Sequence, residues 1–169
     1  MSGIGRRVKK GCSELRNGDY ESAAVAIFQA VDATGRKRFP KKGPGARFMG
    51  LIAEQEDVIT SVAFGVVMTG CTFNGLTIPK ALWKFARNPL IHEAELDSRI
   101  RFDNSSIVIG SVWNLPPTTL LGIAIGVVTA SENAEEDEQL TGSIHFQGQP
   151  IALNGLWGRE KMFRSILTG

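Results

Sequence analysis

The sequence predicts a mainly α-helical fold with small β-hairpins in its second half, so that its content is α+β. Two observations lead to this class. In the first half, apolar residues recur every three or four positions over long stretches, which is the helical period. From about residue 99 onward, several apolar segments are short and separated by turn-forming residues, as in hairpins. A further segment, 118–130, is apolar on nearly all sides and is expected to be a central helix.

The first half is expected to hold a series of helices. Apolar positions at helical spacing predict a first helix over 4–15 and a second over 20–31, which Asp19 can cap at its N-terminus. Gly35 and the prolines of the basic turn that follows end the second helix. The pattern resumes over 46–55 as a helix and over 58–68 as either a helix or a strand.

The later elements are expected to mix helices and hairpins. Asn74-Gly75 predicts a tight hairpin over 72–77, and Pro79 opens a helix that leads into residues 87–92. Further hairpins are expected at about 99–112 and 143–153, and a closing helix at about 156–167. We expect one domain over 1–169, with its helical core at about 4–96 and 117–130.

Composition excludes several broad classes. The chain has 169 residues, of which 43% are hydrophobic and 21% charged, as in ordinary globular proteins. Secretion is not expected, because no apolar segment follows the charged N-terminal residues, and no apolar run is long enough to span a bilayer. Cys12 and Cys71 are isolated, which favours reduced thiols over a disulfide or metal site. We therefore expect a cytoplasmic protein without membrane association, metal or cofactor.

Charge is distributed unevenly along the chain. Residues 1–47 hold eleven Lys and Arg against four Asp and Glu, a balance that can attract a polyanion. The basic turn supplies the candidate phosphate-binding residues, Arg36, Lys37, Arg38, Lys41 and Lys42. Solvated helix ends and a solvated loop would give the same charge pattern, so both interpretations stand.

The segment Arg87-Asn-Pro-Leu-Ile-His-Glu93 carries the residues best suited to chemistry. Histidine titrates near neutrality, so His92 can take a proton from an RNA 2′-hydroxyl and return one to the departing 5′-oxygen. Arg87 can hold phosphate oxygens and offset charge in the transition state, while Asn88 positions a phosphate or a base edge. These three residues are the candidate catalytic residues of a metal-independent RNA cleavage.

The spacing within this segment depends on Pro89. In an unbroken α-helix Asn88 and His92 share a face, whereas Arg87 and His92 lie about 140° apart around the axis. Pro89 removes a backbone donor, so a kink or restart with Asn88 as a cap is expected there. A long Arg87 side chain at such a break can reach the same cleft as His92.

Arg87-Asn88 with His92 resembles the Arg-x4–6-His motif of HEPN (higher eukaryote and prokaryote nucleotide-binding) domains. The segments DYESAA at 19–24, AVDATGRKRFP at 30–40 and LIHEAEL at 90–96 are similar to bacterial proteins of that type, so the resemblance covers about 18–97. It implies a HEPN-like helical bundle, a homodimer whose motifs face one cleft, and metal-independent endoribonuclease activity in toxin–antitoxin or defence systems. A protein antitoxin or regulator is then a further expected partner.

Other interpretations of the same residues stay open. Asp32 and Glu93 are candidate supporting carboxylates, with Asp32 orienting His92 or Arg87; the alternative for Asp32 is a solvated helix-end residue. His92 can be a structural helix-end residue and Arg87 a surface ion-pair partner. The protein would then be a non-catalytic RNA- or nucleotide-binding or protein-interaction module, or a structural oligomer. Sequence motifs of P-loop NTPases, serine hydrolases and zinc proteases do not occur.

Overall fold

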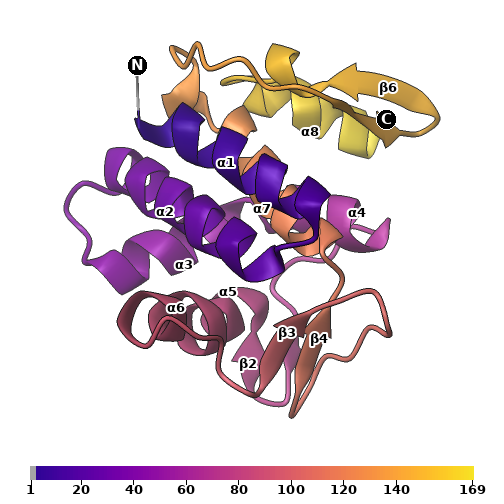
Figure 1. The fold of residues 1–169 in the computed structure, drawn as a ribbon. Helices are drawn as coiled ribbons and strands as arrows, with labels where there is room; N and C mark the ends of the chain where they lie inside the picture. Colours follow the sequence, from indigo (N-terminus) through magenta and orange to yellow (C-terminus); the bar gives the residue numbers. More distant parts are fainter. Residues whose placement is uncertain (1–2) are drawn as a thin grey trace.

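The computed structural model describes residues 3–169, so positions 1 and 2 of the expected domain lie outside the described residues. Four helices come first along the chain, and short strands and further helices follow them (Figure 1). The first half contains α1 (Gly3–Asn17), α2 (Tyr20–Arg38), α3 (Pro44–Glu54), α4 (Glu56–Phe64), β1 (Thr72–Phe73), β2 (Leu76–Thr77) and α5 (Ile78–Ala81). A π-helix, η1 (Leu82–Arg87), leads into the second half.

The second half contains α6 (Asn88–His92), β3 (Ile100–Phe102), β4 (Trp113–Leu115), α7 (Thr118–Thr129), η2 (Ser131–Asn133), β5 (Ser143–Phe146), β6 (Gln149–Ala152), η3 (Leu153–Gly155) and α8 (Glu160–Thr168). The fold is mainly helical with small two-stranded sheets, as the sequence predicts. Among the described residues no helix is long and apolar enough to cross a membrane.

Helix α7 lies in the middle of the molecule, behind α1 and α2 and beside α4 in Figure 1. Nearly all of its side chains are buried, so its prediction as a central helix is confirmed. Close approach to α4 depends on Gly122, because a Cβ atom at this position would come within 2.7 Å of the Ile59 carbonyl oxygen. A glycine therefore sets the distance between the two helices.

Local signals fix the helix ends. The Asp19 side chain accepts a hydrogen bond from the Ser22 amide at 3.0 Å, which confirms the predicted cap of α2. Such a cap stabilises a helix by about 1 kcal/mol. Residues 56–64 form a helix rather than the alternative strand, and Gly65 ends it in the left-handed conformation, with φ 73°. The helix is therefore shorter than the apolar pattern over 58–68 indicates.

Two of the three predicted hairpins are confirmed. Asn74 and Gly75 have φ angles of 49° and 78°, which match the type I′ turn that joins antiparallel strands such as β1 and β2. Strands β5 and β6 also pair antiparallel, across a turn in which Gln147 and Gly148 have positive φ.

The prediction of a hairpin over 99–112 is wrong. Strand β3 instead pairs parallel with β4, whose first residue is Trp113. The indole of Trp113 is fully buried, whereas Ile107, in the expected return strand, is 57% exposed. Burying the larger apolar surface outweighs the local turn signal of residues 103–106.

The closing helix begins later than expected. Residues 153–155 form the 3₁₀ helix η3, and α8 starts at Glu160 rather than near residue 156. Gly158 lies between them with φ 67°, in close contact with the backbone of Ala134, where a larger residue would not fit. The start of α8 is thus displaced by a tertiary contact.

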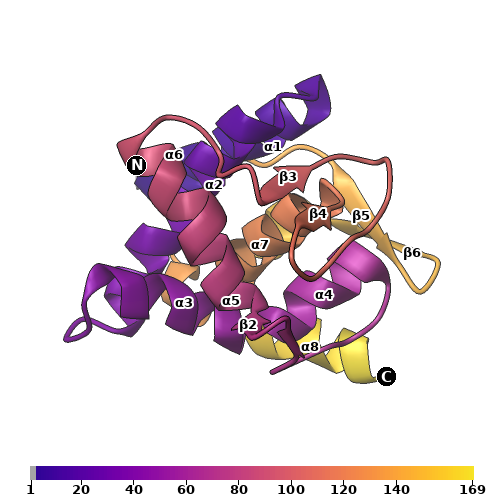
Figure 2. The same cartoon turned by 90° about the horizontal axis from the view of Figure 1, so that it is seen from below.

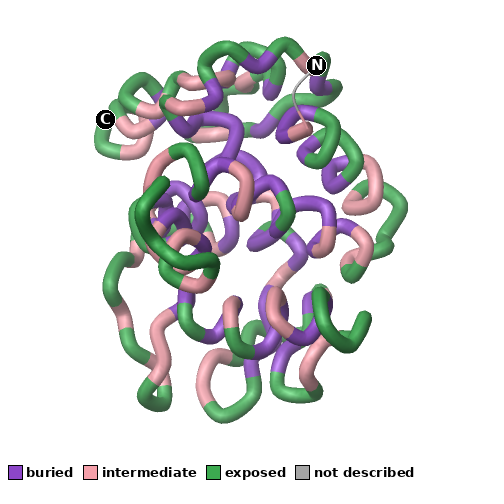
Figure 3. Tube along the Cα trace, turned by 90° about the vertical axis from the view of Figure 1, so that its left-hand side faces the viewer, coloured by how far each residue is buried: buried purple, intermediate pink, exposed green. Residues whose placement is uncertain are grey.

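Buried residues gather in the middle of the chain trace, while exposed residues concentrate in the outer loops and helix faces (Figure 3). One apolar cluster draws side chains from α1 through α8. Trp113, Phe28, Phe48 and Phe163 are its largest fully buried members. Helices distant in sequence, such as α1 and α7, therefore share one core.

Candidate functional site

The predicted motif lies where η1 passes into α6, and Pro89 does not break the helix there. Asn88 has helical angles, φ −68° and ψ −48°, and its amide donates to the Trp83 carbonyl five residues back. The helix thus widens into a π-turn before Pro89, which lacks an amide hydrogen. The expected kink with Asn88 as an N-cap is wrong, because Asn88 is itself helical.

The carbonyl that Pro89 leaves unpaired is used elsewhere. In a regular α-helix the Phe85 carbonyl would accept from residue 89, and here it accepts from the Asp97 amide at 3.0 Å. This bond ties the segment after α6 back to the helix. Arg99 also lies over the Phe85 ring, 4.2 Å from its centre.

Arg87 is held from two sides. Its Nε and Nη2 atoms donate to one oxygen of Asp32, on α2, at 3.1 and 2.8 Å. Its guanidinium also lies 4.6 Å from the ring centre of Trp83. Burial raises the pKa of the Asp32 carboxyl above its ordinary value, while Arg87 and Arg36 act in the opposite direction. Asp32 was expected to orient either His92 or Arg87, and in the structure it contacts Arg87.

A small cavity opens beside this ion pair. It has a volume of about 120 Å³ and is lined by Asp32, Arg36, Pro44, Arg47 and Arg87. We call it the arginine cavity. Three arginines against one aspartate give it an excess of positive charge, although Arg47 already donates to the Phe39 and Pro40 carbonyls. Pro44 begins α3, whose cap Gly43 has no side chain to satisfy the first amides.

His92 and Glu93 lie away from the arginine cavity. Both are exposed at the end of α6, and neither lines the cavity. The Glu93 amide donates to the Pro89 carbonyl four residues back, so the helix is α-helical over this stretch. Arg87 and His92 therefore stay about 140° apart around the axis, by the period of 3.6 residues per turn. Asn88, four residues before His92, shares its face and is half-buried.

The basic turn divides between two faces of the molecule. Arg36 lines the arginine cavity, whereas Lys37 donates to the Glu132 carbonyl and the Asn133 side chain at 3.2 and 3.3 Å. Lys42 lies over the Phe39 ring, and Lys41 is exposed. Consecutive helical residues point about 100° apart, which explains this separation.

Arg38 is committed to carboxylates. It pairs with Glu160 at 2.6 Å, Glu132 at 2.8 Å and Glu54 at 3.0 Å, and its side chain is 10% exposed. Although burial lowers the pKa of Arg38, hydrogen bonds to Glu132 and Glu160 raise it above its ordinary value. The structure thus separates Arg38 from Arg36 and Arg87.

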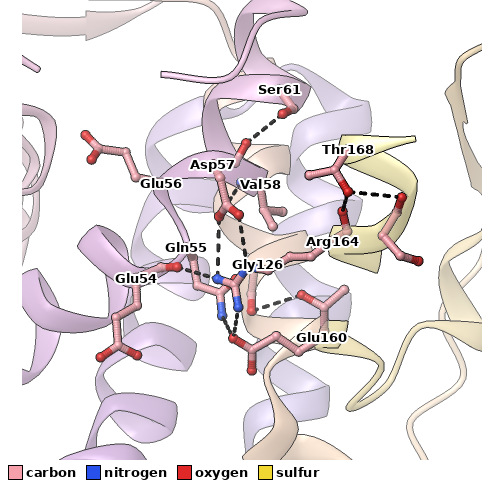
Figure 4. A network of polar contacts seen from close by, with 12 residues as sticks. Glu54, Gln55, Glu56, Asp57, Val58, Ser61, Gly126, Glu160, Arg164 and Thr168 are labelled. Atoms are coloured by element: carbon pink, nitrogen blue, oxygen red, sulfur yellow. Dashed lines mark hydrogen bonds and ion pairs between the residues drawn. The ribbon is translucent and has the colours of Figure 1, made fainter. Parts of the chain in front are cut away.

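The same cluster continues to α8 (Figure 4). Arg164 contacts both Asp57 and Glu160 and donates to the Glu54 carbonyl. Gln55 donates to Glu160 at 3.0 Å. We call these residues, together with Arg38 and Glu132, the α8 ion network. No sequence pattern predicts this network, because its charges are scattered along the chain without local spacing.

The other histidine of the chain, His145, lies outside the predicted motif. His145 is exposed on β5 and far in sequence from the motif. Within residues 3–169 no grouping of three or more His, Cys, Asp or Glu side chains is arranged to hold a metal ion.

The family model described as Rv1289 matches residues 3–169, almost the whole chain. The chain belongs to the Rv1289 family. No curated protein and no solved structure matches this Rv1289-family chain. Its resemblance to HEPN domains and the joint action of Arg87, Asn88 and His92 stay predictions.

Proposed function

We propose that this Rv1289-family protein is a HEPN-like, metal-independent endoribonuclease of the cytoplasm, acting in a toxin–antitoxin or defence system. The observation that carries the proposal is the arginine cavity beside Arg87, at the position where the predicted motif needs positive charge. Arginine guanidinium groups suit phosphate, because their planar donors match its oxygens. An RNA phosphate is accordingly proposed to bind at Arg36 and Arg87.

The reaction requires a proton acceptor and a proton donor. The 2′-oxygen attacks the adjacent phosphorus, the bond to the 5′-oxygen breaks, and a 2′,3′-cyclic phosphate and a 5′-hydroxyl result. His92 takes the 2′-hydroxyl proton and, as an imidazolium, supplies one to the 5′-oxygen. Arg87 offsets charge on the phosphate, Asn88 orients it, and Glu93 lies beside His92 as a supporting carboxylate.

The proposal includes a homodimer, which the placement of Arg87 and His92 in one chain supports. Arg87 faces Asp32 on α2, whereas His92 is exposed on another side of the helix. A second copy is therefore needed to bring a His92 to an arginine-bound phosphate. Ile91, 41% exposed next to His92, offers apolar surface for that contact.

The test is cleavage of a labelled single-stranded RNA in the presence of chelator. We expect products ending in a 2′,3′-cyclic phosphate. In His92→Ala the cleavage rate should fall by about 10²-fold or more, because 10²-fold is the usual minimum for loss of acid–base catalysis. His145→Ala is the matched control, because His145 is the other histidine and is also exposed. Equal loss in both variants, or none in His92→Ala, contradicts the assignment.

A second candidate is RNA or nucleotide binding without turnover. Two observations favour it: Arg87 is already paired with Asp32, and His92 has no hydrogen-bond partner among residues 3–169 to orient its ring. Binding without cleavage that weakens with salt, and that falls further in Arg36→Glu, would support this candidate. Its partner would then be RNA or a protein regulator rather than a substrate.

A further inference from the structure

Two adjoining cavities follow strand β5. One, of about 640 Å³, lies between β5, the end of α4 and α8, and the other, of about 360 Å³, lies between β5, α1 and the start of α7. Both are lined by Thr118, Leu121, Ser143 and Ile144. We call the pair the β5 groove. It lies apart from the arginine cavity, with which it shares no lining residue.

The groove runs along the edge of β5 rather than over one face. Successive residues of a strand point to opposite faces, yet residues 143–147 all line the first cavity and 141–144 all line the second. No residue of β6 lines either cavity. In Figure 2, β5 is the strand nearer to α7, and β6 lies outside it. The edge of β5 away from β6 therefore borders the groove.

This edge offers unpaired backbone groups. The Leu153 amide donates to the Gly142 carbonyl at 3.1 Å, which fixes the alternation of the antiparallel ladder. Ile144 and Phe146 consequently exchange bonds with β6, and the amides and carbonyls of Ser143 and His145 point the other way. Within residues 3–169 the sheet has two strands, so no third strand covers this edge.

The two edges of the hairpin differ. Pro150 lies opposite His145 at an outward-facing position of β6, where it has no amide hydrogen to donate. Proline at such a position blocks the addition of another strand. The β5 edge has no such block, and the contact of Phe146 with the Phe163 ring of α8, at 6.1 Å, holds it in place.

The groove has a defined chemistry. Leu15, Val62, Leu121 and other apolar side chains line it, and none of the described residues that line it carries a side-chain carboxylate. Arg16 is exposed at the α1 end, where it donates to the Thr141 carbonyl at 3.4 Å. An occupant with apolar side chains and a negative group at that end complements these walls.

We propose that the β5 groove binds an extended peptide of a partner protein, which adds as a third strand to β5 and places a carboxylate beside Arg16. Backbone bonds to Ser143 and His145 supply affinity, and alternate apolar side chains enter the two cavities. A small molecule would leave the unpaired strand edge unused. Pairing with the same edge of a second copy is disfavoured, because each edge lies between the walls of its own groove.

The experiment selects random hexapeptides with a free C-terminal carboxylate for binding to the full chain. The strongest hexapeptide is then synthesised with one N-methyl group at each amide in turn. Strand addition predicts loss of binding at alternate amides and tolerance at those between them. Amidation of the peptide's C-terminus should weaken its binding to the native chain. The same amidation should have little effect on binding to the Arg16→Gln variant.

Two proline variants form a matched pair. His145→Pro removes an amide from the groove edge and should weaken binding about tenfold or more, from a lost hydrogen bond and a steric clash. Ala152→Pro removes an outward amide on β6, where φ is −67° and suits proline, and should leave binding unchanged. The proposal would be overturned if the selection gave no binding peptide, or if N-methylation were tolerated at every amide. It would also be overturned if the two proline variants affected binding equally. A self-association broken by His145→Pro would overturn it in favour of a second copy.

Discussion

Asp32 on α2 and Arg87 at the end of η1 form an ion pair across 55 residues of sequence, with Nη2 2.8 Å from Oδ2. The pair is largely shielded from solvent, because the Arg87 and Asp32 side chains are 13% and 22% exposed. It fixes the guanidinium against Trp83 and sets the charge of the arginine cavity.

Asp32→Asn should therefore have two opposite effects. Stability should fall by about 1–2 kcal/mol, because a partly buried guanidinium loses its charge partner. Affinity for a single-stranded RNA should rise, since the arginine cavity loses its negative charge. Urea denaturation and RNA binding at low salt measure the two effects. Asp137→Asn makes the same charge change on an exposed side chain and serves as control. Unchanged stability in Asp32→Asn would contradict the role of the pair.

The α8 ion network predicts a dependence of stability on pH. Burial alone would raise the pKa of Glu160, but hydrogen bonds from Arg38, the Ser131 amide and Arg164 lower it to about 2. A group whose pKa is lower in the folded state stabilises the fold above its unfolded pKa, which is about 4.3 for glutamate. This contribution should be lost as pH falls from about 4.5 to 2.

Glu160→Gln tests this dependence. The variant should lose about 2–3 kcal/mol of unfolding free energy at pH 7 and show a flatter decline between pH 4.5 and 2. Chemical denaturation across that range gives both quantities. Glu135→Gln, on an exposed side chain, is the control. Parallel pH curves for Glu160→Gln and the native chain would rule out the network as the source.

Local patterns predict the helices well, because burial of an apolar face and end signals such as Asp19 act within a few residues. They also predict the Asn74-Gly75 turn, whose positive φ angles those two residues tolerate. The parallel pairing of β3 with β4 escapes such patterns, because it depends on burying Trp113 in a core built by distant helices.

In the candidate site, too, some features can be predicted from local sequence and others depend on distant residues. The sequence singles out Arg87, Asp32 and Arg36, and the structure brings them to one cavity. Sequence patterns do not reveal the Arg38–Glu160 pair, whose members lie 122 residues apart. Nor do they reveal how Pro89 is accommodated, because a π-turn and a kink both remove the same hydrogen bond.

Pro89→Ala tests that accommodation. Alanine restores an amide that can donate to the Phe85 carbonyl and favours a regular α-helix. The Asp97 amide, which now holds that carbonyl, should lose its bond and exchange faster with solvent. Amide hydrogen exchange at Asp97 provides the measurement. Pro79→Ala is the control, since Pro79 occupies the first turn of α5, where an amide needs no helical partner. Unaltered protection of Asp97 would show that the π-turn does not depend on Pro89.

Gly122→Ala tests the packing of α7 against α4. The added methyl carbon would lie 2.7 Å from the Ile59 carbonyl oxygen and 3.0 Å from its Cα, so a backbone rather than a flexible side chain must move. Greater helix propensity favours alanine by about 1 kcal/mol, but overpacking of a close helix contact costs about 1–3 kcal/mol. We expect a net loss of stability in urea denaturation. Gly155→Ala should change stability little, because a Cβ atom added there would meet no described atom within 4 Å beyond its own chain neighbours. A Gly122→Ala variant as stable as the native chain would mean that α4 can shift without disturbing the core around α7.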